Sequence, residues 1–322
     1  MEAVEPVKPE NRKNPKHAFF VQVPCMKSVL PAATLAIALP LSLCGCVVVD
    51  SHGHIAREEK RFTITGAPEL RLTTFDGAIE IRSAETKSVL VEIEKRGPTK
   101  EAIDKLEIDA RQDGNRIEVT VKRPAGEVVV FGIGRMSASA KLVVTMPREG
   151  NVYARSGDGS IRVEEVRGRL ELRTGDGSIR ATDVGGQMVF GTGDGSVTID
   201  NAQGDLDVDT GDGSVSVAGK LDAVKLHTGD GSITFRADPG TSMKSDWSMT
   251  TGDGGVALYL PSDFAAELDA HTGDGAIRNE LSVASRGGED ERERRTLKGR
   301  LGAGGRTLRI RTGDGSVRLK PS

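Results

Sequence analysis

A motif of Thr-Gly-Asp-Gly-Ser followed by an aliphatic residue recurs through the second half of the chain at a fixed interval. Full copies begin at Thr174, Thr192, Thr210 and Thr228, each 18 residues after the last. Variants begin at Ser156, Thr251 and Thr272, one more full copy outside this interval begins at Thr312, and an early relative, Thr-Phe-Asp-Gly-Ala, begins at Thr74. Self-similarity at a fixed period indicates a repeat architecture, in which each unit packs mainly against its neighbours.

Aliphatic residues alternate with polar ones on both sides of the repeated aspartate. Around Asp176, for example, the apolar positions are Leu170, Leu172, Ile179 and Ala181. Among all copies of this frame, only Asn279 places a polar residue at one of these four positions. Alternation with period two is typical of strands that bury one face. Each unit is therefore predicted to be a strand, a Gly-Asp-Gly turn, a second strand and a second turn.

These units predict an all-β fold, a parallel β-solenoid or β-helix built from ~18-residue two-strand repeats. One unit is too thin to bury its apolar side alone, so stacking of successive levels about 4.8 Å apart closes the core. The pattern allows two or three faces and leaves the handedness undetermined. We expect the glycines to adopt positive φ in the turns, and the aspartates to accept backbone hydrogen bonds there.

The repeated aspartates are the candidate binding surface, because stacking places them in a row along one edge. They are Asp158, Asp176, Asp194, Asp212, Asp230, Asp253, Asp274 and Asp314. The simplest interpretation is turn chemistry alone. The alternative is calcium at this row, but Ca²⁺ takes six to eight oxygens and each level supplies one carboxylate. The sequence therefore predicts no cofactor and no metal, with calcium at the aspartates as the remaining alternative.

The front of the chain has the features of an export signal. Met26-Lys27 precedes an apolar stretch at 29–43, which is followed by Cys44-Gly45-Cys46. A positive start, a short apolar run and a small residue before the cleavage point are typical of a secretory signal peptide. The apolar run is short for a membrane span and contains two prolines.

The same stretch resembles a bacterial lipoprotein signal, with a leucine three positions before the cysteine that receives the lipid. The resemblance implies lipidation at Cys46 and anchoring of an exported protein to the membrane through that lipid. It also favours the outer membrane, on its periplasmic or surface side, because Val47 and not an aspartate follows the cysteine.

The sequence divides into five segments. Residues 1–25 are interpreted as an over-extended start and residues 26–45 as the signal peptide. Residues 46–61 would be the lipidated cysteine and a flexible tether, and residues 62–150 an irregular β region that is either the N-terminal part of the solenoid or a cap. A hairpin is predicted around Asp113-Gly114, and one or two helical turns at 99–105. The regular solenoid would fill 151–322, with a charged loop at 285–300.

The repeated strands, the unit at 70–81 and the segment Gly302-Ala303-Gly304-Gly305 resemble the bacterial β-strand-repeat family of adhesin-like proteins with a head-GIN-type domain. The match would cover about Phe62 to Lys320. The resemblance implies a parallel β-solenoid on envelope proteins, many of them lipoproteins. It brings no reaction and no catalytic residues.

These features predict a non-enzymatic envelope lipoprotein that presents a repetitive Thr, Asp and Ser surface to a glycan or an envelope protein. A purely structural scaffold, a calcium-binding repeat protein and a polysaccharide-active enzyme are the alternatives, in that order. The enzyme ranks last because the acids recur at every level instead of clustering once. Nucleic acid is disfavoured by a net charge of −3 and few aromatic residues. The basic end of the chain is expected to be a solvated loop, with anionic envelope polymers as the alternative partner.

Overall fold

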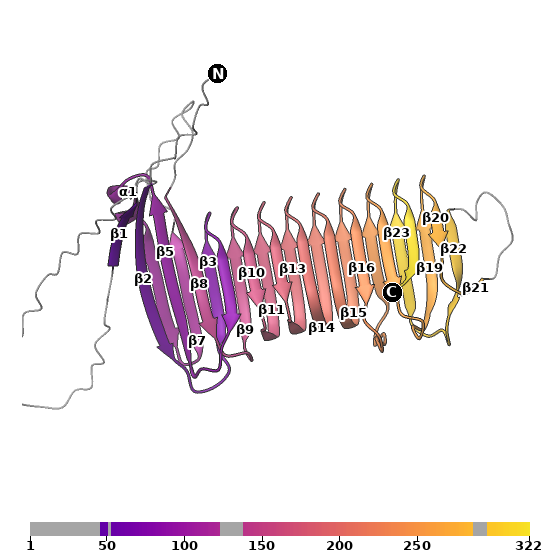
Figure 1. Ribbon diagram of the computed structural model, residues 1–322, viewed down its shortest axis with the longest axis horizontal. Coiled ribbons are helices and arrows are strands. Elements are labelled where there is room, and N and C mark those ends of the chain that lie inside the picture. The colour runs from indigo at the N-terminus through magenta and orange to yellow at the C-terminus, as the bar shows by residue number, and fades with distance from the viewer. Residues whose placement is uncertain (1–45, 51–52, 123–137, 286–294) are drawn as a thin grey trace, which may run out of the picture. The chain divides into compact units, whose positions relative to one another are not determined.

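Parallel strands stacked coil upon coil make up most of the structure (Figure 1). The structure is a computed structural model that describes residues 46–50, 53–122, 138–285 and 295–322. Residues 1–25, the predicted signal peptide at 26–45 and residues 286–294 of the predicted charged loop lie outside this described part. Residues 43–322 form one unit, and the description below concerns that unit.

Each coil contributes one strand before its Gly-Asp-Gly corner and one strand after it, and at the ends of the stack further strands that adjoin no such corner extend the two sheets by pairing beside them. The strands before the corner form what we call the leading sheet. In spatial order they are β6 (Glu107–Asp113), β7 (Arg116–Lys122), β3 (Glu69–Thr74), β9 (Asn151–Ser156), β11 (Arg167–Thr174), β13 (Gly185–Thr192), β14 (Val197–Thr210), β15 (Val215–Thr228), β17 (Trp247–Thr251), β23 (Thr307–Thr312), β19 (Ala266–Thr272), β22 (Thr296–Leu301) and β21 (Val283–Ser285).

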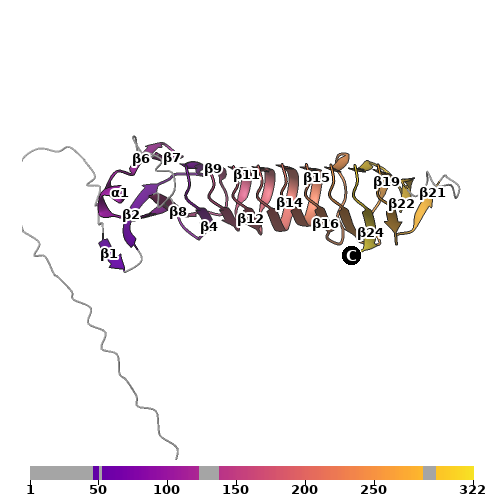
Figure 2. The ribbon, with the colours of Figure 1, turned by 90° about the horizontal axis from the view of Figure 1, so that it is seen from above.

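The strands after the corner form the trailing sheet. In spatial order they are β1 (Cys46–Asp50), β2 (Gly53–Thr63), β5 (Ser88–Gly97), β8 (Ser139–Met146), β4 (Ile79–Ser83), β10 (Ile161–Glu164), β12 (Ile179–Thr182), β14, β15, β16 (Ile233–Ala237), β18 (Val256–Leu260), β24 (Val317–Pro321) and β20 (Ile277–Asn279). The long strands β14 and β15 run from the trailing sheet of one coil into the leading sheet of the next. The predicted β-solenoid is thus confirmed, and it has two faces (Figure 2).

The core lies between the two sheets, where the alternating aliphatic residues point. Leu170, Leu172, Ile179 and Ala181 are all fully buried, and so are their counterparts in the neighbouring coils. Coils pair in register, with Leu170 opposite Met188 and Ile179 opposite Val197. Each side chain therefore packs against its equivalent one level away, which gives the continuous core that a single unit lacks.

The second turn of each coil, at the far edge of the sheets, contains the backbone with positive φ. Gly168, Gly186, Gly204 and Gly219 adopt φ of 145°, 106°, 108° and 159°. Three residues that are not glycine, Glu165, Asp183 and Asn201, adopt φ of 58°, 55° and 55°. They occupy equivalent places in three successive coils, and Asn201 donates a hydrogen bond to Asp183. Left-handed backbone costs a residue with a side chain about 1–2 kcal/mol, least for Asn and Asp.

Antiparallel strands and one short helix close the N-terminal end of the stack. The predicted hairpin forms from β6 and β7, with Gly114 at φ 58° in its turn. The predicted helical turns appear as α1 (Lys100–Asp104), which is capped by the Thr99 side chain. Residues 46–61 differ from the expected tether, since they form β1 and most of β2. Their charged residues suit a strand because opposite charges meet across it, as Arg57 does with Glu94.

The last coil in the sequence is not the last coil in the stack. Strands β23 and β24 lie between the coil of β17 and β18 and the coil of β19 and β20. The outermost coil therefore carries Asn279, whose side chain exchanges two hydrogen bonds of 3.0 Å with the backbone of Leu281. Among the described strands, β20 pairs only with β24, so its outer side is not covered by another coil. This position explains why Asn279 departs from the aliphatic column.

Candidate functional site: the aspartate corners

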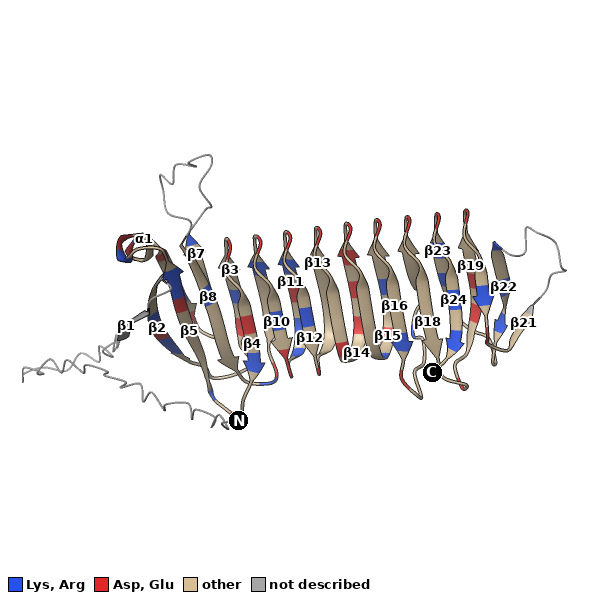
Figure 3. Cartoon of the chain, turned by 45° about the horizontal axis from the view of Figure 1, so that its top comes forward, with Lys and Arg blue, Asp and Glu red and all other residues tan. Residues whose placement is uncertain are grey.

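The eight predicted aspartates stand at the tips of successive corners along one edge of the stack (Figure 3). We call this row the ladder. All eight are exposed, and in space they follow the order 158, 176, 194, 212, 230, 253, 314 and 274. The corner of Asp76 precedes them, and this residue is only partly exposed. Along the row, Asp314 precedes Asp274, whereas Asp274 comes first in the sequence.

Close backbone stacking, and not positive φ, is the reason for glycine at the corners. None of the glycines in the repeated Gly-Asp-Gly corners has φ in the left-handed region, which corrects the expectation from the sequence. Instead, Gly211 N donates to Gly193 O at 2.7 Å, one coil away. A Cβ atom built on Gly213 would lie 1.9 Å from Gly195 O. Because no side chain fits there, the corners stack at the spacing of the bare backbone.

The corner threonines are buried, which corrects the prediction that they belong to the presented surface. The exposed fractions of Thr210, Thr228 and Thr272 are 1%, 0% and 0%. The Thr228 hydroxyl donates toward Gly211 O at 3.2 Å and Gly213 O at 2.9 Å in the preceding coil, and it accepts from Gly231 N at 3.2 Å in its own. Since it satisfies carbonyls that face the core, this column is structural. The strict recurrence of threonine at this position was the feature of the sequence that could have revealed this structural role.

The ladder carboxylates have few partners inside the molecule. Asp274 forms an ion pair with Arg295 at 3.2 Å. The other seven form no ion pair or side-chain hydrogen bond with any residue that the structure describes. The sequence led us to expect backbone N–H groups to donate to these carboxylates. No such hydrogen bond is found among the residues that the structure describes. The row is thus a line of solvated negative charges about one strand spacing, ~4.8 Å, apart.

The ladder does not converge on a metal site within the described part of the chain. No group of three or more His, Cys, Asp or Glu side chains is placed there to hold one ion. Stacked carboxylates offer one ligand per level, whereas Ca²⁺ requires several oxygens around one point. The arrangement suits a partner that extends along the row better than it suits a single ion.

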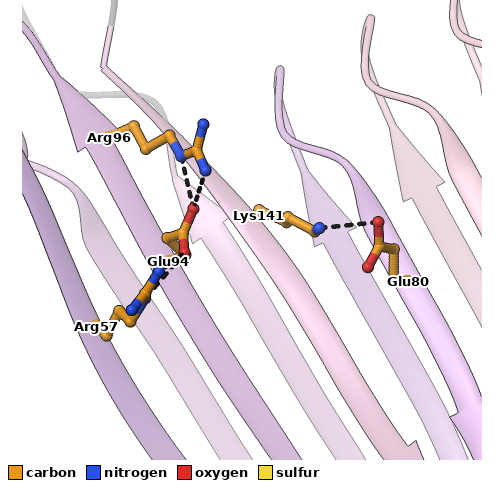
Figure 4. Close-up of polar contacts among 5 residues, drawn as sticks. All are labelled: Arg57, Glu80, Glu94, Arg96 and Lys141. Atoms are coloured by element: carbon orange, nitrogen blue, oxygen red, sulfur yellow. Dashed lines mark hydrogen bonds and ion pairs between the residues drawn. The ribbon is translucent and has the colours of Figure 1, made fainter. Parts of the chain in front are cut away.

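A second concentration of charge lies on the outer face of the N-terminal strands (Figure 4). Glu94 binds Arg57 Nη2 at 2.8 Å and Arg96 Nε at 2.6 Å, and Lys141 binds Glu80 at 2.8 Å. Burial raises the pKa of Glu94, but the hydrogen bonds and charges of the two arginines outweigh it and hold the pKa below its usual value. Arg57, Glu80, Glu94 and Lys141 line an open groove there, but their charges are engaged with one another and with Arg96, so they do not form a second candidate site.

The fold and its repeated corners define a class, the two-faced parallel β-solenoid. The chain belongs to the Toastrack DUF4097 family, whose model matches residues 68–320. This range agrees with the span over which the sequence resembles a β-strand-repeat family. Membership brings no established reaction, so any function must be argued from the residues themselves.

Several solved structures of low identity are similar to the chain. A candidate cell adhesion protein from Clostridium sporogenes is 15% identical, with 83% of this chain and 99% of that one covered and a TM-score of 0.27. A candidate lipid-binding protein from Parabacteroides distasonis is 13% identical, with 82% and 96% covered and a TM-score of 0.46. A candidate adhesin from Bacteroides fragilis is 8% identical, with the same coverages and a TM-score of 0.38. No curated protein matches the chain.

Proposed function

We propose that the chain is a non-enzymatic, adhesin-like module of the cell envelope that contacts a glycan or an envelope protein through the ladder. The observation that supports this most directly is the row of exposed carboxylates, seven of which lack a partner among the described residues. A partner that carries hydroxyl or cationic groups at a similar spacing would engage several levels at once. Such repeated contacts give useful avidity even when each one is weak.

Four acidic side chains outside the ladder are engaged by arginines within the protein. Arginine partners hold the pKa values of Glu69, Glu94, Glu171 and Asp269 below their usual range, although burial alone raises each of them. General acids in hydrolases need a raised pKa, so these groups suit ion pairing instead.

Anchoring through Cys46 is part of the same proposal and rests on the sequence of residues 26–46. Cys46 begins β1, which pairs with β2 at the N-terminal end of the stack. A lipid at this cysteine would leave the ladder and the other end of the stack free. No helix within the described residues is long and apolar enough to cross a membrane. The intact mass of the mature protein tests the anchor, because any residue retained before Cys46 contradicts it.

A matched pair of variants tests the ladder. Wild-type protein and a variant with Asp176, Asp194, Asp212 and Asp230 changed to Asn are applied to a glycan array and to envelope extract of the producing cells. A control variant changes Asp200, Asp205, Asp209 and Asp263 to Asn, which are exposed aspartates outside the ladder. We expect the ladder variant alone to lose binding. Equal binding by both variants would exclude the ladder and favour a structural spacer.

The same proteins separate the calcium alternative from this proposal. Melting temperatures are measured with millimolar Ca²⁺ and with chelator. A rise with Ca²⁺ that disappears in the ladder variant would show ion binding by linkage and would contradict a direct contact with the partner. We expect the two melting curves of the wild type to coincide.

A further inference from the structure

The outer face of the trailing sheet carries an unusual row of residues four positions after each corner aspartate. Strand register aligns Arg162 with Arg180 near one end of this row and Arg318 with Arg278 at the other. All four arginines are exposed. Like charges directly opposite one another on neighbouring strands destabilise a sheet. The face contains this unfavourable arrangement twice, on adjacent coils each time.

Acids also lie on this face: Glu80, which Lys141 binds at 2.8 Å, is opposite Arg162, and Glu164, Asp200 and Glu280 are exposed in the next row. The four arginines nevertheless form no ion pairs of the kind that arginines on the opposite face form. None of them forms an ion pair or hydrogen bond with any residue in the described part of the chain. On the leading sheet, by contrast, Arg155 and Arg173 share Glu171 at 3.6 and 3.1 Å, although they too are paired across adjacent coils. The trailing sheet therefore presents positive charge that remains available to an external anion.

Three hydroxyl residues and one alanine, Ala257, occupy the same row between the two arginine pairs. Thr198, Ser216 and Thr234 stand in register on β14, β15 and β16. Tyr259 lies in the next row, with the Arg236 guanidinium 4.6 Å from its ring centre. Lys320 is opposite Tyr259 and forms an ion pair with Glu280 at 3.7 Å. Small hydroxyl side chains on a parallel sheet leave a flat strip, and an aromatic ring with cations beside it suits the face of a sugar that bears negative charge.

We propose that this face binds a linear anionic polysaccharide that runs along the stack, with the Arg162 and Arg180 pair holding one part and the Arg318 and Arg278 pair another. Five coil steps separate Arg180 from Arg318, which is about 24 Å at the strand spacing. The polymer's carboxylate or sulfate groups would contact the guanidinium pairs, and its hydroxyls the Ser and Thr side chains between them. The face is separate from the ladder, so this inference does not depend on the proposed function.

The test measures binding of the full chain to polygalacturonate, dextran sulfate and neutral dextran by titration calorimetry at several salt concentrations. We expect both anionic polymers to bind and neutral dextran not to bind. Changing Arg318 and Arg278 to Gln should weaken binding about tenfold and lower the slope of log affinity against log salt by about 1–2, since two ionic contacts are lost. A short galacturonate oligomer that reaches only one pair should bind more weakly than the polymer, because it loses avidity.

Two controls decide the outcome. The variant with Arg155 and Arg173 changed to Gln removes the same charge from the leading sheet and should keep the affinity for polygalacturonate within about twofold. The ladder variant removes four aspartates and should keep that affinity within about twofold or raise it. An equal loss in the Arg155 and Arg173 variant would overturn the assignment to this face. Equally tight binding of oligo-dT would overturn the assignment to polysaccharide and leave a general polyanion surface. If the ladder variant no longer binds its envelope partner but still binds polygalacturonate, the two binding sites are separate.

Discussion

A methyl group added at one corner glycine tests the stacking of the coils most severely. In Gly213→Ala the new Cβ atom would lie 1.9 Å from Gly195 O and 2.5 Å from Gly195 C, whereas Cβ contacts under 3.0 Å essentially never occur. The main obstacle is the Gly195 backbone, which no side-chain rotation relieves, and the Thr210 Oγ1 atom also lies within 2.9 Å. The two corners must therefore separate by about 1.1 Å, which is the difference between 1.9 and 3.0 Å.

A separation of that size breaks the local hydrogen bonds between the coils. Gly211 N to Gly193 O at 2.7 Å would lengthen beyond bonding range, as would the contacts of the Thr210 hydroxyl with Gly193 O and Gly195 O, both at 3.2 Å. The Thr210 hydroxyl has one hydrogen shared between two carbonyls and counts as one bond, so two bonds are lost at about 1 kcal/mol each, and residual strain adds about 1–3 kcal/mol. We expect Gly213→Ala to lower the free energy of unfolding by about 3–5 kcal/mol.

Gly191→Ala is the matched control, because it lies in a strand with room for a methyl group. Its Cβ would have no neighbour closer than 3.7 Å, and we expect a change within about 0.5 kcal/mol or a small gain. Urea unfolding followed by circular dichroism and by the fluorescence of Trp247, the only tryptophan and a fully buried one, measures both variants. Equal stability of the two variants would refute the account of the corner glycines.

Three further predictions concern the corner hydroxyls, the second turn and acid. Thr210→Val should lower the free energy of unfolding by about 1–2 kcal/mol, because it leaves buried carbonyls without a donor; Thr210→Ser keeps the hydroxyl and should cost less, so a larger loss for Ser would contradict this. Glu165→Asn should raise stability by about 0.5–1 kcal/mol, because Asn tolerates φ of 58° better, and an unchanged urea midpoint would count against strain there. The pKa of Glu94 is lowered in the folded state, so its contribution is present above its ordinary pKa of about 4.5 and disappears as pH falls below it. Melting temperature should therefore drop between about pH 5 and pH 3, and less steeply in Glu94→Gln; parallel curves would contradict this contribution.

The repeat made most of the architecture predictable from the sequence. Alternation around Asp176 identified strands, their buried faces and the corner, because period-two burial is a local property that each unit repeats. The outward position of the ladder followed from the same frame.

Features that depend on contacts between coils were beyond the sequence. The role of Gly213 comes from a neighbouring backbone 1.9 Å away, and glycine in a turn looks the same whether φ or stacking requires it. The insertion of β23 and β24 before the outermost coil was hidden because all coils share one pattern and are interchangeable in a sequence argument. The strand β2 was missed because partners of its charged residues, such as Glu94 for Arg57, lie on β5, which is adjacent in space but separated in sequence.

Carboxyl footprinting measures the central claim, contact through the ladder, most directly. The full chain is labelled with carbodiimide and glycine ethyl ester, free and bound to envelope fragments of the producing cells, and the modified aspartates are quantified by mass spectrometry. The account predicts that Asp176, Asp194, Asp212 and Asp230 become protected, while the exposed Asp200, Asp205 and Asp263 keep their labelling. Unchanged labelling of the four ladder residues in the bound state would contradict it.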